Sequence, residues 1–260
     1  MGTQEDSALE AALLAFVERE QPELVVASGD LTHRGRADQH ARAAALLRSL
    51  GPPVLAVPGN HDIPYTFPAR FTRTFDRFER EWGTTEPVHR SETLVVAGLN
   101  SVRAWRQQSG GVRAAQLART AEVLRAAPAA VLRVVVLHHQ LIGAPWRTQK
   151  KPVARRNAVL AALVDAGADL VVAGHVHQSA VSERREFEVA LANERAVVIS
   201  TAPGLGHPRP RKRGEARGLH VYEAENGALS VATHMWTGGD WELIAQRRFP
   251  RGAAALAVPV

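Results

Sequence analysis

Cysteine is missing from the 260-residue sequence, and this absence excludes disulfides and thiolate metal sites. Long apolar runs are missing as well: no stretch of eighteen apolar residues occurs, and the N-terminus has no basic segment followed by an apolar one. The sequence therefore predicts neither a membrane span nor a signal peptide, and it favours a cytoplasmic protein. Because 45% of the residues are hydrophobic, we expect one domain with one substantial core over residues 1–260.

Lysine is scarce: it occurs only at Lys150, Lys151 and Lys212, so arginine carries nearly all of the positive charge. The formal net charge is +6, which allows non-specific attraction to nucleic acid. No basic stretch interleaved with aromatic residues occurs, so the sequence does not favour nucleic acid as the substrate. It predicts no particular oligomeric state.

Four apolar runs each deliver polar groups at their C-terminal ends. Gly29-Asp30 comes after residues 24–27, Gly59-Asn60-His61-Asp62 after residues 54–57, His138-His139 after residues 134–137, and Gly174-His175-Val176-His177 after residues 170–173. Taken singly, several of these residues are ordinary turn formers. Taken together, they indicate one site, because ligands of open α/β sheets bind at the carboxyl ends of the strands. In the last block, strand alternation would aim both imidazoles at one face.

The side chains of these blocks offer carboxylate, amide and imidazole groups, and this set suits Mn²⁺, Fe or Zn²⁺. A carboxylate that bridges two cations can hold them about 3.5–4 Å apart, which is the spacing of two-metal sites that hydrolyse phosphoesters. The pattern therefore predicts a metal-dependent phosphoester hydrolase.

The series resembles the signature of the calcineurin-like metallophosphoesterases: Asp-x-His, Gly-Asp, Gly-Asn-His-Asp/Glu, His and Gly-His-x-His. Four of these five blocks are present in order, and the resemblance runs from about Ser7 to Trp236. It implies two metal ions and a small phosphoester substrate. The short layout is similar to that of the bacterial class III cyclic-AMP phosphodiesterases, which implies a small phosphodiester such as a cyclic nucleotide.

The resemblance also implies roles for individual residues. Asp30 would bridge the two metals, Asn60, His138 and His175 would complete one site, and His177 would belong to the other. His61 would contact the phosphate and protonate or stabilise the leaving group, and Asp62 would orient His61.

The first block of the signature, Asp-x-His, does not precede Gly29-Asp30, and no histidine occurs before His33. Ser7 is instead typical of a helix N-cap, and an apolar stripe at helical spacing follows at Leu9, Leu13, Phe16 and Val17. We therefore expect the chain to begin at the first helix of the fold and to lack its opening strand. The first metal would then have only two protein ligands, so a single bound metal remains an alternative.

Strand and helix patterns alternate along the rest of the chain. Together with the resemblance, they predict an α/β fold with a two-sheet β-sandwich flanked by helices. Asn226-Gly227 between two strand patterns is a strong hairpin signal. The predicted helices cover residues 37–50, 67–82, 114–126 and 157–166, and the predicted later strands cover residues 94–99, 170–173, 196–201, 218–223 and 228–235. Residues 67–82 place Phe71, Phe75, Phe78 and Trp82 at helical intervals, which predicts a helix or a cap over the entrance of the site.

Two alternatives to a working phosphodiesterase follow from these observations. The missing block motivates a catalytically impaired domain that binds one metal or a phosphorylated ligand, and the charge motivates a nucleic-acid phosphoesterase. Among the other polar residues, His139 either supports its neighbours or faces the substrate, and His33 is expected in a solvated loop. Residues 207–213 form a basic stretch interrupted by proline, which favours a surface loop over a phosphate clamp.

Overall fold

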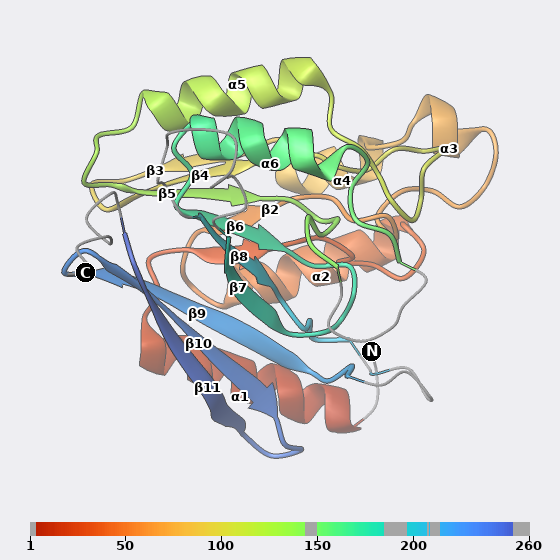
Figure 1. Ribbon diagram of the computed structural model, residues 1–260. Helices are drawn as coiled ribbons and strands as arrows, with labels where there is room; N and C mark the ends of the chain where they lie inside the picture. The colour runs from red at the N-terminus through yellow and green to blue at the C-terminus, as the bar shows by residue number, and fades with distance from the viewer. Residues whose placement is uncertain (1–3, 144–149, 185–196, 207, 209–213, 252–260) are drawn as a thin grey trace.

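The computed structural model describes residues 4–143, 150–184, 197–206, 208 and 214–251 (Figure 1). The basic stretch Arg209 to Arg213 lies outside the described residues. The helices are α1 (Gln4–Glu20), α2 (Ala37–Ser49), α3 (Ala69–Thr72), α4 (Asp76–Trp82), α5 (Ala114–Arg125) and α6 (Arg156–Asp165). The strands are β1 (Val25–Ala27), β2 (Val54–Ala56), β3 (Val88–Arg90), β4 (Leu94–Gly98), β5 (Leu132–Val136), β6 (Leu170–Ala173), β7 (Ala180–Arg184), β8 (Val197–Thr201), β9 (Gly218–Glu225), β10 (Ala228–Trp236) and β11 (Trp241–Pro250).

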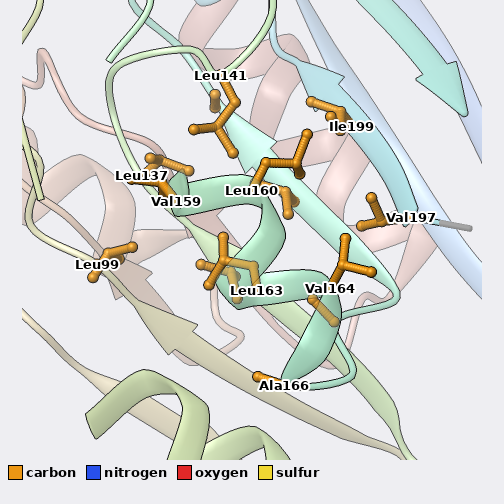
Figure 2. Packing of buried hydrophobic residues seen from close by; sticks show 14 of the residues in the cluster. Leu99, Leu137, Leu141, Val159, Leu160, Leu163, Val164, Ala166, Val197 and Ile199 are labelled. Carbon is orange, nitrogen blue, oxygen red and sulfur yellow. The ribbon is translucent and has the colours of Figure 1, made fainter. Parts of the chain in front are cut away.

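A six-stranded sheet in the order β3-β4-β5-β6-β8-β7 forms the centre of the molecule. Its inner strands β4, β5, β6 and β8 are parallel, and antiparallel strands close both edges. Every residue of β6 and β8 is buried, as expected for parallel strands that are covered on both faces. Helices α5 and α6 lie over one face, where Leu160 and Leu163 pack with Leu137 and Ile199 (Figure 2).

The other face of this sheet packs against the remaining strands. A two-stranded parallel sheet, β1-β2, and a three-stranded antiparallel sheet, β11-β10-β9, share this second core, which contains Leu55, Leu170, Leu229 and Phe249. Hydrogen bonding therefore groups the described strands into three sheets, where we expected two. Helix α1 covers the outer side of the three-stranded sheet through the predicted apolar stripe, all of which is buried (Figure 1).

The predicted hairpin at Asn226-Gly227 is confirmed. Both residues have positive φ, 50° and 71°, as a type I′ turn requires, and the turn joins β9 to β10 in antiparallel register. Strand β11 was not predicted, because most of its side chains are exposed and its sequence has no alternating apolar face. The short edge strands β3 and β7 were missed as well.

Two predictions about helices were wrong in detail. Helix α1 begins at Gln4, so Ser7 lies inside the helix and does not cap it. Residues 67–82 form two short helices, α3 and α4, where we expected one helix or cap. Only Phe78 of the expected apolar stripe is fully buried, whereas Phe71 is exposed, so no continuous apolar face exists to hold one long helix against the core.

A half-buried histidine, His220, joins β9 to the six-stranded sheet. The Nδ1 atom of His220 lies 2.8 Å from the hydroxyl of Ser200, and its Nε2 atom lies 2.8 Å from the hydroxyl of Ser179. Burial, and then the charge of His234, lowers the pKa of His220 to about 4. The imidazole is therefore neutral in the folded protein at pH 7.

Within the described part of the chain, no helix is both long and apolar enough to cross a bilayer.

Candidate metal centre

The predicted site residues follow two pairs of parallel strands, one pair in each of two sheets. Asp30 lies just beyond β1 and Asn60 beyond β2, which is parallel to β1. His138 lies beyond β5 and His175 beyond β6, which is parallel to β5. Each strand is apolar and pairs inside a core, so its carboxyl end places the following polar residue at one edge of the molecule.

Two glycines let the loops after β1 and β2 meet at backbone contact. A Cβ atom on Gly59 would lie 2.0 Å from the backbone nitrogen of Asp30. A Cβ atom on Gly29 would lie 2.6 Å from the nitrogen of Gly59 and 2.7 Å from Nδ1 of His138. Gly29 also has a φ of +91°, which side chains rarely tolerate. Any larger residue at either position would push the loops apart.

Four potential ligand atoms converge around His138. Its Nε2 atom lies 3.0 Å from Nδ1 of His175, 3.1 Å from Oδ1 of Asn60 and 3.3 Å from Oδ1 of Asp30. We call Asp30, Asn60, His138 and His175 the cation cluster. Metal bonds of about 2.0–2.2 Å to nitrogen or oxygen would place neighbouring ligand atoms about 3.0–3.5 Å apart. The observed spacings therefore match those around a small metal ion.

Hydrogen bonds on the far side of each ring show where the lone pairs of the cluster point. Nδ1 of His138 donates to the carbonyl of Ser28 at 2.9 Å, and Nε2 of His175 donates to the carbonyl of Gln108 at 3.1 Å, because a carbonyl oxygen can only accept. In the neutral rings, Nε2 of His138 and Nδ1 of His175 therefore carry lone pairs. Two lone pairs and two side-chain oxygens face one point, which is unfavourable unless a cation or a proton lies among them.

Asp30 offers a second oxygen to a cation. Its Oδ2 atom is buried and has no hydrogen-bond partner among the described residues, whereas Oδ1 accepts the backbone N–H of His61 at 2.9 Å. Burial disfavours the carboxylate, but the charge of His138 and its hydrogen bond outweigh this effect and lower the pKa of Asp30. An ionised, unpaired carboxylate oxygen in a buried position fits the predicted bridging role.

The imidazole of His175 stays neutral, which suits a metal ligand. Burial, and then the neighbouring charges of His138 and His139, lowers the pKa of His175. His138 behaves differently, because Asp30 raises its pKa against the effect of burial.

His177 does not join the cation cluster. The group of ligand atoms that lie within 4.8 Å of one another among the described residues contains Asp30, His138 and His175. The strand alternation on which we based our expectation for the two imidazoles does not apply here, because β6 ends at Ala173. Both histidines have positive φ, 71° for His175 and 58° for His177, so the chain turns there and does not continue as a strand.

His61 lies beside the cluster and is partly exposed. Its Nδ1 atom is 2.9 Å from the carbonyl of His33 and 2.7 Å from the hydroxyl of Tyr65. The side chain of His33 is exposed, as expected for a loop, and its ring stacks on that of His61 with centroids 6.0 Å apart. Sequence reasoning missed Tyr65, whose spacing of four residues from His61 was the only available signal.

Asp62 makes contacts that differ from the one we expected. Its carboxylate does not hold the ring of His61 but accepts three backbone N–H groups, from Leu31 at 3.2 Å, Thr32 at 2.8 Å and Gly59 at 2.8 Å. The side chain is fully buried, and burial, followed by the charge of Asp30, raises the pKa of Asp62. Asp62 therefore ties the loop after β1 to the loop after β2.

His139 supports the cluster from behind. Its ring is fully buried, with Nδ1 2.9 Å from the hydroxyl of Ser101 and Nε2 3.2 Å from the carbonyl of Gln107. Burial, and then the charge of His138, lowers the pKa of His139 to about 3. Of the two roles left open for His139, burial excludes direct contact with substrate. Gln107 and Gln108 act through backbone carbonyls, which every residue has, so the sequence held no signal for them.

Comparisons with known proteins found similarity in sequence and in fold. A stretch of 44 residues is 46% identical in sequence to part of the glycerophosphodiester phosphodiesterase GpdQ of Enterobacter lignolyticus (strain SCF1). This stretch covers 17% of this chain and 16% of that protein. The structure is similar to a dimetal phosphatase from Danio rerio, with a TM-score of 0.65, 15% identity, and coverage of 95% of this chain and 89% of that one. It is also similar to GAP50, the anchor in the inner membrane complex of Plasmodium, with a TM-score of 0.65, 14% identity, and coverage of 97% and 86%.

At these identities the structural likenesses establish the fold alone, and the sequence match spans a small part of its relative. The family assignment comes from a different comparison. The model of the calcineurin-like phosphoesterases matches residues 3–179, which include every member of the cation cluster. Because this match spans more than half of the sequence, the chain belongs to the calcineurin-like phosphoesterase family.

Proposed function

We propose that this protein is a metal-dependent hydrolase that cleaves a small phosphodiester, such as a cyclic nucleotide. The observation that carries the proposal is the convergence of two lone-pair nitrogens and two side-chain oxygens in the cation cluster at metal-ligand spacing. The local similarity to a glycerophosphodiester phosphodiesterase supports a diester over a monoester. Manganese, iron and zinc suit this set of oxygen and nitrogen ligands.

Asp30, Asn60, His138 and His175 would hold one metal ion. The unpaired Oδ2 atom of Asp30 would reach a second, for which His177 is the remaining candidate ligand. Bound ions of this kind supply Lewis acidity and acidify water for attack on phosphorus.

We assign to His61 the role of donating a proton to the leaving group. The carbonyl of His33 accepts from Nδ1, so Nε2 is the ring nitrogen left to face the departing alcohol oxygen, and the doubly protonated ring would donate its Nε2 proton to that oxygen. The backbone N–H of His61 donates to Asp30, which fixes the ring close to the cluster. Asp62 contributes indirectly, because its three backbone hydrogen bonds hold both loops in place.

A second candidate function is a domain that binds one metal ion or a phosphorylated ligand without efficient catalysis. The position of His177 outside the group of ligand atoms favours it, because the described residues complete only one set of ligands. The two candidates differ in metal content and in turnover.

The test is hydrolysis of bis-p-nitrophenyl phosphate with added Mn²⁺, with metal content measured on the same sample. We expect turnover with close to two metals per chain, and we expect His175→Ala to lose both. His89→Ala, which removes a histidine from β3 at the sheet edge, is the matched control and keeps both. One metal or fewer without turnover would reject the hydrolase and support the binding domain.

A further inference from the structure

Four large aromatic side chains are exposed beside the cation cluster. Tyr65 is 43% exposed, Phe67 83%, Phe71 53% and Trp105 67%, although exposing aromatic rings to water is unfavourable. We call these four residues the aromatic rim. They come from two segments of the chain, the one that leads into α3 and the loop between β4 and α5.

Hydrogen bonds connect the first segment to the site. The hydroxyl of Tyr65 lies 2.7 Å from Nδ1 of His61, and the rings of Phe67 and Phe71 lie 6.5 Å apart by their centroids. This segment thus starts at the residue that we assign to the leaving group and continues outward as an aromatic surface. Helix α3, which carries Phe71, projects from one side of the molecule (Figure 1).

The second segment is joined to the site just as closely. The loop that carries Trp105 places the carbonyls of Gln107 and Gln108 on the rings of His139 and His175. Arg70 ties the two segments together, because it donates to the carbonyl of Ala104 at 2.9 Å and to that of Pro64 at 3.1 Å. Arg70 therefore links the two segments that carry the rim, and each segment also contacts a histidine of the site.

Charges of both signs act on the rim at Tyr65. Burial, and then the charge of Asp30, raises the pKa of the Tyr65 hydroxyl, whereas the guanidinium groups of Arg70 and Arg34 lower it, so both guanidinium groups lie within electrostatic reach of that hydroxyl. The site thus combines a place for a phosphate with a flat apolar surface next to it. Stacking on aromatic side chains is the usual way in which proteins bind nucleobases without reading their edges.

We propose that the aromatic rim binds the planar base of a nucleotide-like phosphoester and thereby selects substrates with a ring close to the phosphate. This proposal rests on the proposed function, because it specifies the substrate class of the same site. Trp105 and Phe71 are the principal stacking residues. Tyr65 connects the base-binding surface to His61.

Equilibrium binding of AMP and of ribose 5-phosphate tests the proposal, because these probes share a phosphate and a ribose and differ in the base. We measure both by calorimetry with added Mn²⁺. We expect AMP to bind about tenfold more tightly than ribose 5-phosphate to the unchanged protein, the effect of one stacked base. The ratio falls to about two in Trp105→Ala and in Phe71→Ala, and it stays near ten in Trp105→Phe, which keeps a ring.

Ile244→Ala is the matched control, since Ile244 is 59% exposed on β11 in another sheet and its loss leaves the ratio unchanged. Equal affinities for both probes, or no binding of AMP, would overturn the proposal. Equal affinities together with a dimer that Trp105→Ala dissociates would assign the rim to contact between copies of this chain.

The two proposals fail in different ways. If the protein prefers AMP but does not hydrolyse bis-p-nitrophenyl phosphate, the rim binds the base and the proposed hydrolase activity is absent. If the protein hydrolyses bis-p-nitrophenyl phosphate but binds both probes equally, the proposed activity is present and the rim does not bind the base.

Discussion

The cation cluster and the entrance around His61 are built in opposite ways. Each ring of the cluster is held by a hydrogen bond from behind, and its members follow strands that pair inside the cores. His61 and the aromatic rim sit on loops, are partly or largely exposed, and are joined mainly through Tyr65 and Arg70. The comparison indicates that metal binding is fixed by the core of the fold, whereas substrate handling depends on loops that can vary without disturbing the core.

The largest expected effect is that of replacing His61, which should change turnover without changing metal binding. We expect His61→Ala to lower turnover about 10²- to 10⁴-fold, the usual contribution of a general acid, while metal content is unchanged. Turnover of bis-p-nitrophenyl phosphate and metal content, measured on one sample, check this. His33→Ala is the control, because its exposed ring lies in the same entrance and its contact with His61 is made through the backbone carbonyl. Loss of metal in His61→Ala would show that entrance and cluster are not separable.

A smaller effect tests whether Asp62 belongs to the rigid region. Asp62→Asn exchanges a charged acceptor for an amide whose NH₂ group faces backbone N–H donors, so the free energy of unfolding should fall by about 2–3 kcal/mol. Urea unfolding measures it. Asp165→Asn, at an exposed position at the end of α6, is the matched control. Equal stability of the two variants would mean that the loops after β1 and β2 hold together without the carboxylate.

The smallest effect concerns a residue that belongs to neither region, His220. Its pKa falls from its ordinary value of 6.5 to about 4 on folding, so the unfolded chain binds more protons between these values. The contribution of His220 to the free energy of unfolding is complete above pH 6.5 and decreases as the pH falls toward 4. Lowering the pH from 7 to 5 should cost about 2 kcal/mol at this residue. His220→Gln should flatten that part of the pH profile in urea unfolding, and an unchanged slope would contradict the assignment.

All four members of the cation cluster could be predicted because the sequence marks strand ends clearly. Short apolar runs followed by Gly29-Asp30 or His138-His139 place the polar groups once the strands are parallel. The backbone at His177 could not be predicted, because periodicity does not show where a strand stops. β6 ends at Ala173, and two positive φ values then redirect the chain.

The parts that could not be predicted are those made by the backbone. The carbonyls of Ser28, Gln107 and Gln108 orient three imidazoles, and the N–H groups of Leu31, Thr32 and Gly59 bind Asp62, but no side-chain pattern announces either set. The aromatic rim escaped for a related reason. Phe71, Phe75, Phe78 and Trp82 recur at helical spacing, which predicts a buried face, and only the structure shows that Phe71 turns outward.

The contact between Gly29 and Gly59 has a consequence for cation binding. Because backbone touches backbone there, the loop that carries Asp30 cannot move closer to the loop that carries Asn60. The distance between these ligands is therefore set when the chain folds, and a cation that arrives afterwards orders little that was loose. Its radius, and not the compliance of the loops, then decides how well it is accepted.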